Sequence, residues 1–468
     1  MVTHRVAGSP LDFAALRAEL AVAGDFPSDV LADAERSAVD VQLPDEDATD
    51  IPFVTVDPAG SRDLDQALHI AREGDGFLVS YAIADVASFV RPGSPVDEEA
   101  QRRGETLYFP DVRVPLHPPV LSEGAASLLP EAVRPAVLWR ITLDATGDVR
   151  AVDVRRARVR SRAQLDYVGV QHDLDAGSLP DALALLADVG TRRLALARAR
   201  HAINLELPAQ EVEQDGDSWH LVLRKPLAVE DYNAEISLLT GMCAAQIMLE
   251  YRHGILRTLP EPDPDAVRAL RRAAVALGIA WPSGMAPGDA LATLDRGNPR
   301  HAALVEHATA LLRGAGYTDF VGTLPKIRTH SGIGAAYAHV TAPLRRLVDR
   351  YGTEICLAAH AGTDVPAWVD ERLAALPSTM READRRAREL DRAVVDTTEA
   401  WLLRERVGQI FDALVIDAED HAATITLDDP PVRARCTGDN LPIGERIPAR
   451  LIEADPDKRT VRFEAARR

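Results

Sequence analysis

The sequence predicts an α+β protein in which an antiparallel sheet surrounded by helices is followed by a small all-β barrel. Three observations support this prediction. Hairpin-like strand patterns begin after residue 50, helical periodicity dominates from about Pro180 to Arg406, and short strand patterns return after Arg406. The chain has 468 residues, 46% of them hydrophobic, which is enough for one large core and one or two small domains. We therefore expect a helical extension over 1–50, a large domain over 51–405 and a barrel over 406–468.

The individual elements follow in chain order. Ser9 and Pro10 precede LDFAALRAELAVAG, which predicts a helix with Ser9 as its N-cap and Pro10 in its first turn. From Ile51 the pattern becomes that of antiparallel hairpins, with turn signals at 74–76 and 147–148. The strand segments are IPFVTVD, ALHIARE, FLVSYAIADVASFV, AVLWRITLD and VRAVDVRRARVRS. The predicted helices cover 181–202, 233–254, 265–278, 301–316 and 371–406.

Composition excludes several classes of protein. The chain carries 72 acidic and 53 basic residues, a net charge of -19, so any nucleic-acid partner must enter a locally basic groove. Cys243, Cys356 and Cys436 lie far apart without a CxxC pair, which argues against a disulfide framework or a thiolate zinc site. No signal peptide and no run of ~18 apolar residues is present, so we expect a cytoplasmic protein with no membrane partner. No obligate protein partner is evident.

The stretch VTVDPAGSRDLDQA crowds carboxylates. The β-branched segment 54–56 leads to Asp57, a turn follows, and Asp63 and Asp65 share one side of an extended chain. This pattern can gather three carboxylates around one point, where mutual repulsion raises their pKa values or requires a cation such as Mg²⁺ or Mn²⁺. The alternative is an aspartate-rich surface turn. A calcium EF-hand is excluded because the required glycine and closing glutamate are missing.

A second cluster lies in HSGIGAAYAHVTAPLRRLVDRYG, residues 330–352. Thr341-Ala342-Pro343 predicts the start of a helix whose first turn carries Arg345 and Arg346. A helix N-terminus with adjacent guanidinium groups is suited to holding phosphate. The alternative is a capped helix with a solvated basic face.

In their order and spacing, these motifs resemble the RNB catalytic domain of the ribonuclease II family. The resemblance rests on VTVDPAGSRDLDQALHI, on VSYAIADVASFVRPGSPVDEEAQRRGETLYFPDVRVPLHPPVLSEGAASLL and on TAPLRR, and it extends from about Ile51 to His360. The segment from about Val407 is similar to the family's RNA-binding OB-fold barrel. The resemblance implies a hydrolytic 3′→5′ exoribonuclease that degrades single-stranded RNA to nucleoside 5′-monophosphates with Mg²⁺, or with Mn²⁺ in its place.

The resemblance also implies roles for residues of the two motifs. Asp57 and Asp63 match metal ligands, and Asp65 matches the aspartate whose loss is most damaging to cleavage. We expect Asp63, Asp65 and Arg345 to be catalytic, with Arg345 neutralising charge that develops on the scissile phosphate. Gln66 stands where the family has a fourth aspartate. Its amide oxygen can still ligate Mg²⁺, but less strongly than a carboxylate does.

Four further residues are expected to bind RNA by the same resemblance. Tyr108 matches a tyrosine near the 3′-terminal nucleotides, and Tyr167 matches an aromatic residue that stacks on RNA farther out. Arg346 follows Arg345 in the motif, and Glu235 lies near a glutamate that the family uses beside the RNA channel. Leu205 replaces a phenylalanine that clamps the terminal bases, and losing one stacking face costs ~1–3 kcal/mol of base binding.

Other departures concern architecture and activity. The family commonly has two cold-shock-type barrels before the catalytic domain, and residues 1–50 are too few for them, so we expect a short form that favours short or unstructured RNA. Leu347 replaces a usual tyrosine, and 354–355 lies where a His-Arg pair is usual. Two alternatives remain open: a catalytically inactive RNA-binding paralogue, and a chain whose carboxylates hold a structural metal while the basic helix contacts a protein partner.

Overall fold

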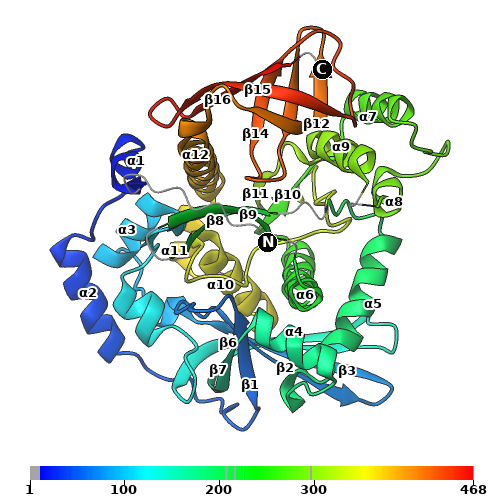
Figure 1. Cartoon of the computed structure of the whole chain (residues 1–468). Coiled ribbons are helices and arrows are strands. Elements are labelled where there is room, and N and C mark those ends of the chain that lie inside the picture. Colours follow the sequence, from blue (N-terminus) through cyan, green and yellow to red (C-terminus); the bar gives the residue numbers. More distant parts are fainter. Residues whose placement is uncertain (1–10, 206–208, 216–217, 225, 296–297, 467–468) are drawn as a thin grey trace.

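The computed structural model describes residues 11–205, 209–215, 218–224, 226–295 and 298–466. Two closed five-stranded barrels lie at opposite ends of the molecule, with helices between them (Figure 1). The strands of the first barrel are β1 (Phe53–Asp57), β2 (Gln66–Glu73), β3 (Gly76–Ala84), β6 (Val133–Leu143) and β7 (Val149–Asp166). The strands of the second are β12 (Ile410–Glu419), β13 (Ala422–Thr426), β14 (Arg433–Thr437), β15 (Arg446–Asp455) and β16 (Thr460–Ala465).

The first barrel follows the predicted hairpins and adds one parallel contact. β2–β3, β3–β6 and β6–β7 pair antiparallel. β1 pairs antiparallel with β2 and parallel with β7, which places Asp57 beside Asp166 and closes the barrel. An alternating pattern shows which face of a strand is buried. It does not show whether a strand far away in sequence pairs with it parallel or antiparallel. The core of this barrel includes Phe77, Tyr81 and Trp139.

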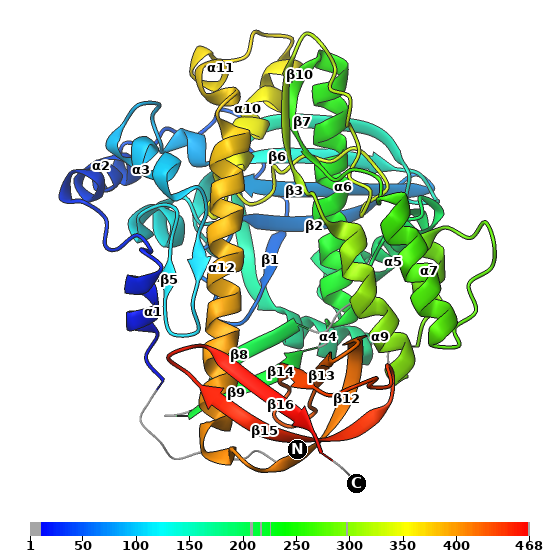
Figure 2. The same cartoon turned by 90° about the horizontal axis from the view of Figure 1, so that it is seen from above.

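Two long helices cover this barrel and share its core. α6 (Ala228–Tyr251) and α10 (Leu347–Ala361) contribute Ile236, Leu239 and Ile355 to the same buried cluster as Trp139. α12 (Leu376–Leu403) runs from the first barrel to the second and contacts β15 and β16 (Figure 2). Further helices are α2 (Ser28–Val39), α3 (Pro95–Arg103), α4 (Tyr167–Ala176), α5 (Leu186–Ala199) and α11 (Ala367–Leu373).

A group of three helices has a hydrophobic core of its own beside the second barrel. It consists of α7 (Pro264–Ala276), α8 (Pro287–Ala292) and α9 (Pro299–Ala308). Leu205 is buried in this core with Leu270 and Leu304, so its side chain packs against apolar neighbours. The helix predicted over 301–316 ends at Ala308 and continues as one 3₁₀ turn, Thr309–Leu312. The other short helical turns are Val86–Ser88, Leu121–Ala125, Asp181–Leu183 and Arg404–Arg406.

The second barrel confirms the strand pattern read after Arg406. Its strand order is β12-β13-β14-β16-β15, and β14 pairs parallel with β16. Its core includes Phe411 and Phe463, whose rings meet edge to face with centroids 5.7 Å apart. Three two-stranded sheets complete the fold: β4 (Leu107–Tyr108) with β5 (Arg113–Val114), β8 (Ala209–Asp215) with β9 (Ser218–Arg224), and β10 (His253–Thr258) with β11 (Gly316–Val321).

The first described helix, α1 (Phe13–Glu19), begins later than predicted. Asp12 is its N-cap and accepts a hydrogen bond from the backbone N–H of Ala14 at 2.8 Å. The predicted capping residues Ser9 and Pro10 lie outside the described residues. Within the described ranges, no helix has both the length and the apolar character needed to cross a bilayer.

Candidate active site

The aspartates lie where β1 ends and β2 begins. β1 delivers Asp57 as predicted, and the eight residues between the two strands carry Asp63 and Asp65. The backbone carbonyl of Asp65 accepts a hydrogen bond from the N–H of Ala84 at 2.9 Å, which ties the end of this loop to β3. The loop therefore leaves the end of the barrel and returns to it, with its acidic side chains beside residues 341–346.

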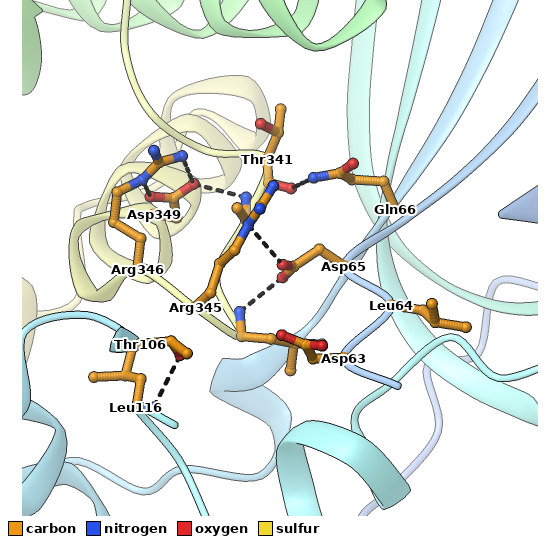
Figure 3. Close-up of polar contacts among 12 residues, drawn as sticks. Asp63, Leu64, Asp65, Gln66, Thr106, Leu116, Thr341, Arg345, Arg346 and Asp349 are labelled. Carbon is orange, nitrogen blue, oxygen red and sulfur yellow. Dashed lines mark hydrogen bonds and ion pairs between the residues drawn. The ribbon is translucent and has the colours of Figure 1, made fainter. Parts of the chain in front are cut away.

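Asp65 is the most buried member of the cluster, with 3% of its surface exposed. Its Oδ1 accepts a hydrogen bond from the backbone N–H of Leu344 at 2.8 Å, and its Oδ2 lies 3.4 Å from Nε of Arg345 (Figure 3). Burial raises the pKa of Asp65 to about 8, although Arg345 opposes this rise. Burial thus favours the neutral form of the Asp65 carboxyl group, against the charge of Arg345.

Residues 341–346 form a turn, so the predicted helix start at Pro343 is wrong. The backbone N–H groups of Arg345 and Arg346 both donate to the carbonyl of Ala342, and α10 begins only at Leu347. Two aspartates accept the N–H groups that the turn leaves free: Asp65 takes that of Leu344, and Asp349 takes that of Ala342 at 2.7 Å. These side-chain acceptors stabilise the turn against helix.

Asp57 and Asp63 have different surroundings. The Oδ2 atom of Asp57 is buried without a hydrogen-bond partner, and burial raises the pKa of this group to about 6. Asp63 forms an ion pair through Oδ1 with Arg113, while its Oδ2 accepts a hydrogen bond from the hydroxyl of Tyr108 at 3.2 Å. Among the described residues, no three acidic, histidine or cysteine side chains converge on one metal-ligating point. The carboxylates are therefore neighbours, but Asp63 is turned toward its own partners.

The carboxylates nevertheless suit a hard divalent cation. Burial leaves one oxygen of Asp57 without a partner and raises the pKa of both Asp57 and Asp65, and a cation bound to these carboxylates would offset both costs. Oxygen ligands of this kind are preferred by Mg²⁺ and Mn²⁺. Gln66 donates its side-chain N–H to the carbonyl of Thr341 at 2.5 Å, which commits the amide nitrogen and leaves Oε1 as its ligand atom (Figure 3).

Of the two tyrosines, Tyr108 is 45% exposed and Tyr167 is half-buried. Tyr167 begins α4, and its hydroxyl accepts a hydrogen bond from the side-chain amide of Asn233 at 3.2 Å. Burial raises the pKa of Tyr167, and the charge of Asp57 raises it further. The charge of Asp63 acts on Tyr108 and that of Asp57 acts on Tyr167, so both tyrosines lie within electrostatic reach of the cluster.

Two predicted RNA-binding residues are engaged elsewhere. Arg346 binds Asp349 through two hydrogen bonds, 2.5 and 3.0 Å long, and only 23% of its side chain is exposed. Glu235 is 4% exposed on α6, where burial raises its pKa and the charges of Arg193 and Arg200 oppose that rise. Asn233, which bonds to Tyr167, is two residues away and thus on the opposite side of that helix. Glu235 and Asn233 therefore lie on different sides of α6.

Sequence reasoning missed Arg113. It lies in β5 directly opposite Tyr108 in β4, and both side chains reach Asp63. An available signal was the spacing, because Tyr108 and Arg113 flank a four-residue turn that contains Pro110 and Asp111. A hairpin of this length places the two residues side by side.

Comparison with known proteins identifies the class of this fold. A family description of the RNB domain matches residues 45–358, and one of the RNase II-type exonuclease C-terminal S1 domain matches residues 409–466. The chain belongs to the RNB family of ribonuclease II-type proteins.

Named relatives refine this placement. The chain is 26% identical over 485 residues to Ribonuclease R of Escherichia coli, a match covering 89% of this chain and 57% of that protein. It is 30% identical over 405 residues to Exoribonuclease 2 of Serratia proteamaculans, covering 81% and 61%. The chain thus spans less than two thirds of these relatives. A solved structure of Mycoplasma genitalium RNase R with ribose-methylated single-stranded RNA shares the fold, with a TM-score of 0.87, 20% identity and coverage of 97% and 77%.

Proposed function

We propose that this protein is a hydrolytic 3′→5′ exoribonuclease that degrades single-stranded RNA to nucleoside 5′-monophosphates. The observation that carries the proposal is Asp65, a buried carboxyl group held between the N–H of Leu344 and the guanidinium group of Arg345. Family membership supports it, and so do the names of the relatives, Ribonuclease R and Exoribonuclease 2. We also propose that residues 51–405 form the catalytic domain after an N-terminal extension over 1–50, that 406–468 form an RNA-binding barrel, and that the protein acts in the cytoplasm.

Asp57, Asp63 and Asp65 would hold Mg²⁺ or Mn²⁺, with Oε1 of Gln66 as a weaker fourth ligand. When bound, such a cation activates water and stabilises the leaving 3′-oxygen. The unpartnered Oδ2 of Asp57 supports this assignment, because a buried carboxylate oxygen is stable only when it is paired. Asp63 would join these ligands if Arg113 released its Oδ1 atom.

The chain's own residues position the RNA. Half of the Arg345 side chain is exposed, so its guanidinium group can bind a phosphate oxygen while its Nε stays beside Asp65. A guanidinium group is always charged and matches phosphate geometry, so Arg345 would stabilise negative charge that develops at the scissile phosphate. Tyr108 exposes 45% of its surface next to Asp63, which allows its ring to stack on a base near the 3′ end.

A time course tests the proposal. A 5′-labelled single-stranded RNA is incubated with the protein and Mg²⁺ or Mn²⁺, beside the Asp65→Asn variant and a DNA of equal sequence. We expect a ladder that shortens from the 3′ end and release of 5′-monophosphates, both absent with the variant. RNA that stays intact with either metal would contradict the proposal.

The second candidate is an RNA-binding protein without nuclease activity. Gln66 favours it, because the side chain in the place of a fourth carboxylate donates its N–H to Thr341. This candidate predicts that intact RNA binds the wild-type protein and the Asp65→Asn variant with equal affinity. The buried carboxyl groups of Asp57 and Asp65 argue for the nuclease, since burying them costs stability that an inactive chain would recover by replacing them.

A further inference from the structure

The β4–β5 hairpin occupies both oxygens of one aspartate. Tyr108 and Arg113 are paired across this two-stranded sheet, so their side chains emerge next to each other. The Tyr108 hydroxyl donates to Oδ2 of Asp63, and the Arg113 guanidinium group donates to Oδ1. The other two aspartates differ: Asp57 keeps an unpartnered oxygen, and Asp65 is held by Leu344 and Arg345 of the turn at 341–346.

The backbone of this hairpin is fixed on several sides. Phe109, in its turn, is buried in the same core as Phe13 of α1. Arg17 of α1 donates to Asp111 at 2.7 Å, and its guanidinium group lies 5.1 Å from the centre of the Phe109 ring. Just before β4, the N–H of Thr106 donates to the carbonyl of Arg345 at 2.9 Å. The strands that carry Tyr108 and Arg113 are therefore anchored. These two residues can release Asp63 only by moving their side chains.

Arg113 already has a second acceptor within reach. Its other terminal nitrogen lies 3.7 Å from Oε1 of Glu123, whose side chain is 23% exposed. Glu123 follows in the Leu121–Ala125 turn and also attracts Arg62, at 3.6 Å. The Arg113 side chain is 29% exposed, so it has room to change partner without leaving solvent. One guanidinium group thus lies between two carboxylates, of which only Asp63 belongs to the acidic cluster.

We propose that Arg113 is a positioning residue that competes with a divalent cation for Asp63 and transfers to Glu123 when the cation binds. The proposal rests on the proposed function only in requiring that the acidic cluster binds a cation. The Arg113 guanidinium group occupies Oδ1 of Asp63, and its positive charge opposes a second cation at the same carboxylate, so the ion pair lowers the affinity of the site. Glu123 offsets part of that loss, because it accepts the guanidinium group that Asp63 releases.

The test measures binding of Mn²⁺ to the full chain by titration calorimetry and by the electron paramagnetic resonance of free Mn²⁺, without RNA. Arg113→Gln removes the competing charge, and we expect it to bind Mn²⁺ about fivefold to tenfold more tightly than the wild type. Arg113→Lys keeps the charge and should bind with nearly wild-type affinity. Arg62→Gln is the matched control, because it removes the same charge beside Glu123 without touching Asp63.

Glu123→Gln removes the second acceptor and should weaken Mn²⁺ binding about threefold relative to the wild type. In the double variant Arg113→Gln/Glu123→Gln this effect should vanish, since the Arg113 guanidinium group that Glu123 would accept is absent. Equal or weaker binding by Arg113→Gln overturns the inference, as does a Glu123→Gln effect that persists in the double variant. If wild type cleaves RNA and binds Mn²⁺ but Arg113→Gln does not differ, the inference alone fails. If no variant binds Mn²⁺ and none cleaves, the proposed function fails with it.

Discussion

Asp65 accepts a hydrogen bond from the backbone N–H of Leu344, a residue 279 positions later in the chain. This bond joins the loop after β1 to the turn before α10, and it places the Arg345 guanidinium group beside the same carboxyl group. Because Asp65 is buried, the bond links the stability of the fold directly to the geometry of the candidate active site.

Two substitutions at Asp65 should separate its contribution to the stability of the fold from its contribution to RNA cleavage. Asp65→Asn retains an oxygen that accepts from Leu344, and burial already favours the neutral form of the Asp65 carboxyl group, so we expect nearly wild-type stability. Asp65→Ala leaves the Leu344 N–H buried and unpaired, which should cost about 1–3 kcal/mol of the free energy of unfolding. Both variants should lose at least about a thousandfold in RNA cleavage. Urea unfolding and single-turnover cleavage check the two outcomes, and an Asp65→Ala variant as stable as Asp65→Asn would contradict the role of the Leu344 bond.

Tyr108 should contribute to RNA binding through its ring. Tyr108→Ala removes a ring that is 45% exposed beside Asp63, and we expect it to weaken binding of single-stranded RNA by about 1–3 kcal/mol and to change the length of the final fragment. Tyr108→Phe keeps the ring and should retain most of the affinity. Fluorescence anisotropy with labelled RNA measures both. Tyr251→Ala, at the far end of α6, is a control that should leave binding unchanged; equal losses in all three variants would refute stacking by Tyr108.

The α1 contact should stabilise the hairpin that carries Tyr108 and Arg113. Arg17→Ala removes the ion pair with Asp111 and the contact with the Phe109 ring, and it should lower the free energy of unfolding by about 1 kcal/mol. Amide hydrogen exchange should become faster in residues 106–116. Arg36→Ala on α2 removes a more exposed ion pair, with Asp33, and should leave exchange there unchanged. Unaltered exchange in Arg17→Ala would show that the core contacts alone hold the hairpin.

Glu399 should make stability depend on pH. It is 4% exposed on α12 and accepts hydrogen bonds from the side chain of Gln210 and the backbone N–H of Arg433, each 2.8 Å long. Burial raises its pKa from 4.5 to about 7. The folded protein therefore binds the Glu399 proton more tightly than the unfolded chain does. The contribution of Glu399 to stability is fully present below about pH 4.5 and is lost as the pH rises through about 7.

We expect the wild type to lose about 2–3 kcal/mol more than Glu399→Gln between about pH 5 and pH 8, measured by urea unfolding. The comparison cancels the other titrating groups, since both proteins share them. Parallel curves for the two proteins would show that Glu399 does not carry this dependence.

Gly241 should be intolerant of a side chain. A Cβ atom there would lie 2.2 Å from Cε2 of Tyr337 and 2.6 Å from the carbonyl oxygen of Ala338, so α6 and the segment that leads to Arg345 would have to separate. We expect Gly241→Ala to cost about 1–3 kcal/mol, measured by thermal unfolding, despite the higher helix propensity of alanine. Gly316→Ala, with open space around it, is the control and should be neutral. A neutral Gly241→Ala would mean that this packing is looser than described.

The sequence by itself determined the local elements. Strand patterns predicted the hairpins of the first barrel and the short strands of the second, and helical periodicity over 233–254 predicted the helix that the structure shows as α6, Ala228–Tyr251. It also placed Asp57 at the end of a strand, because β-branched residues followed by a Pro-Gly turn specify that ending locally. Family membership followed from the order of the motifs, which is a property of the chain.

Only the tertiary structure decided which side chains meet. The turn at 341–346 replaces a predicted helix start because Asp65 and Asp349 accept its N–H groups, and Asp65 lies far away in sequence. Arg113 reaches Asp63 only because a hairpin puts it opposite Tyr108, whereas Glu235 faces Arg193 and Arg200 because of its position around α6. Hydrogen bonds and ion pairs form over a few ångströms, and neither propensity nor periodicity encodes the distances between distant segments.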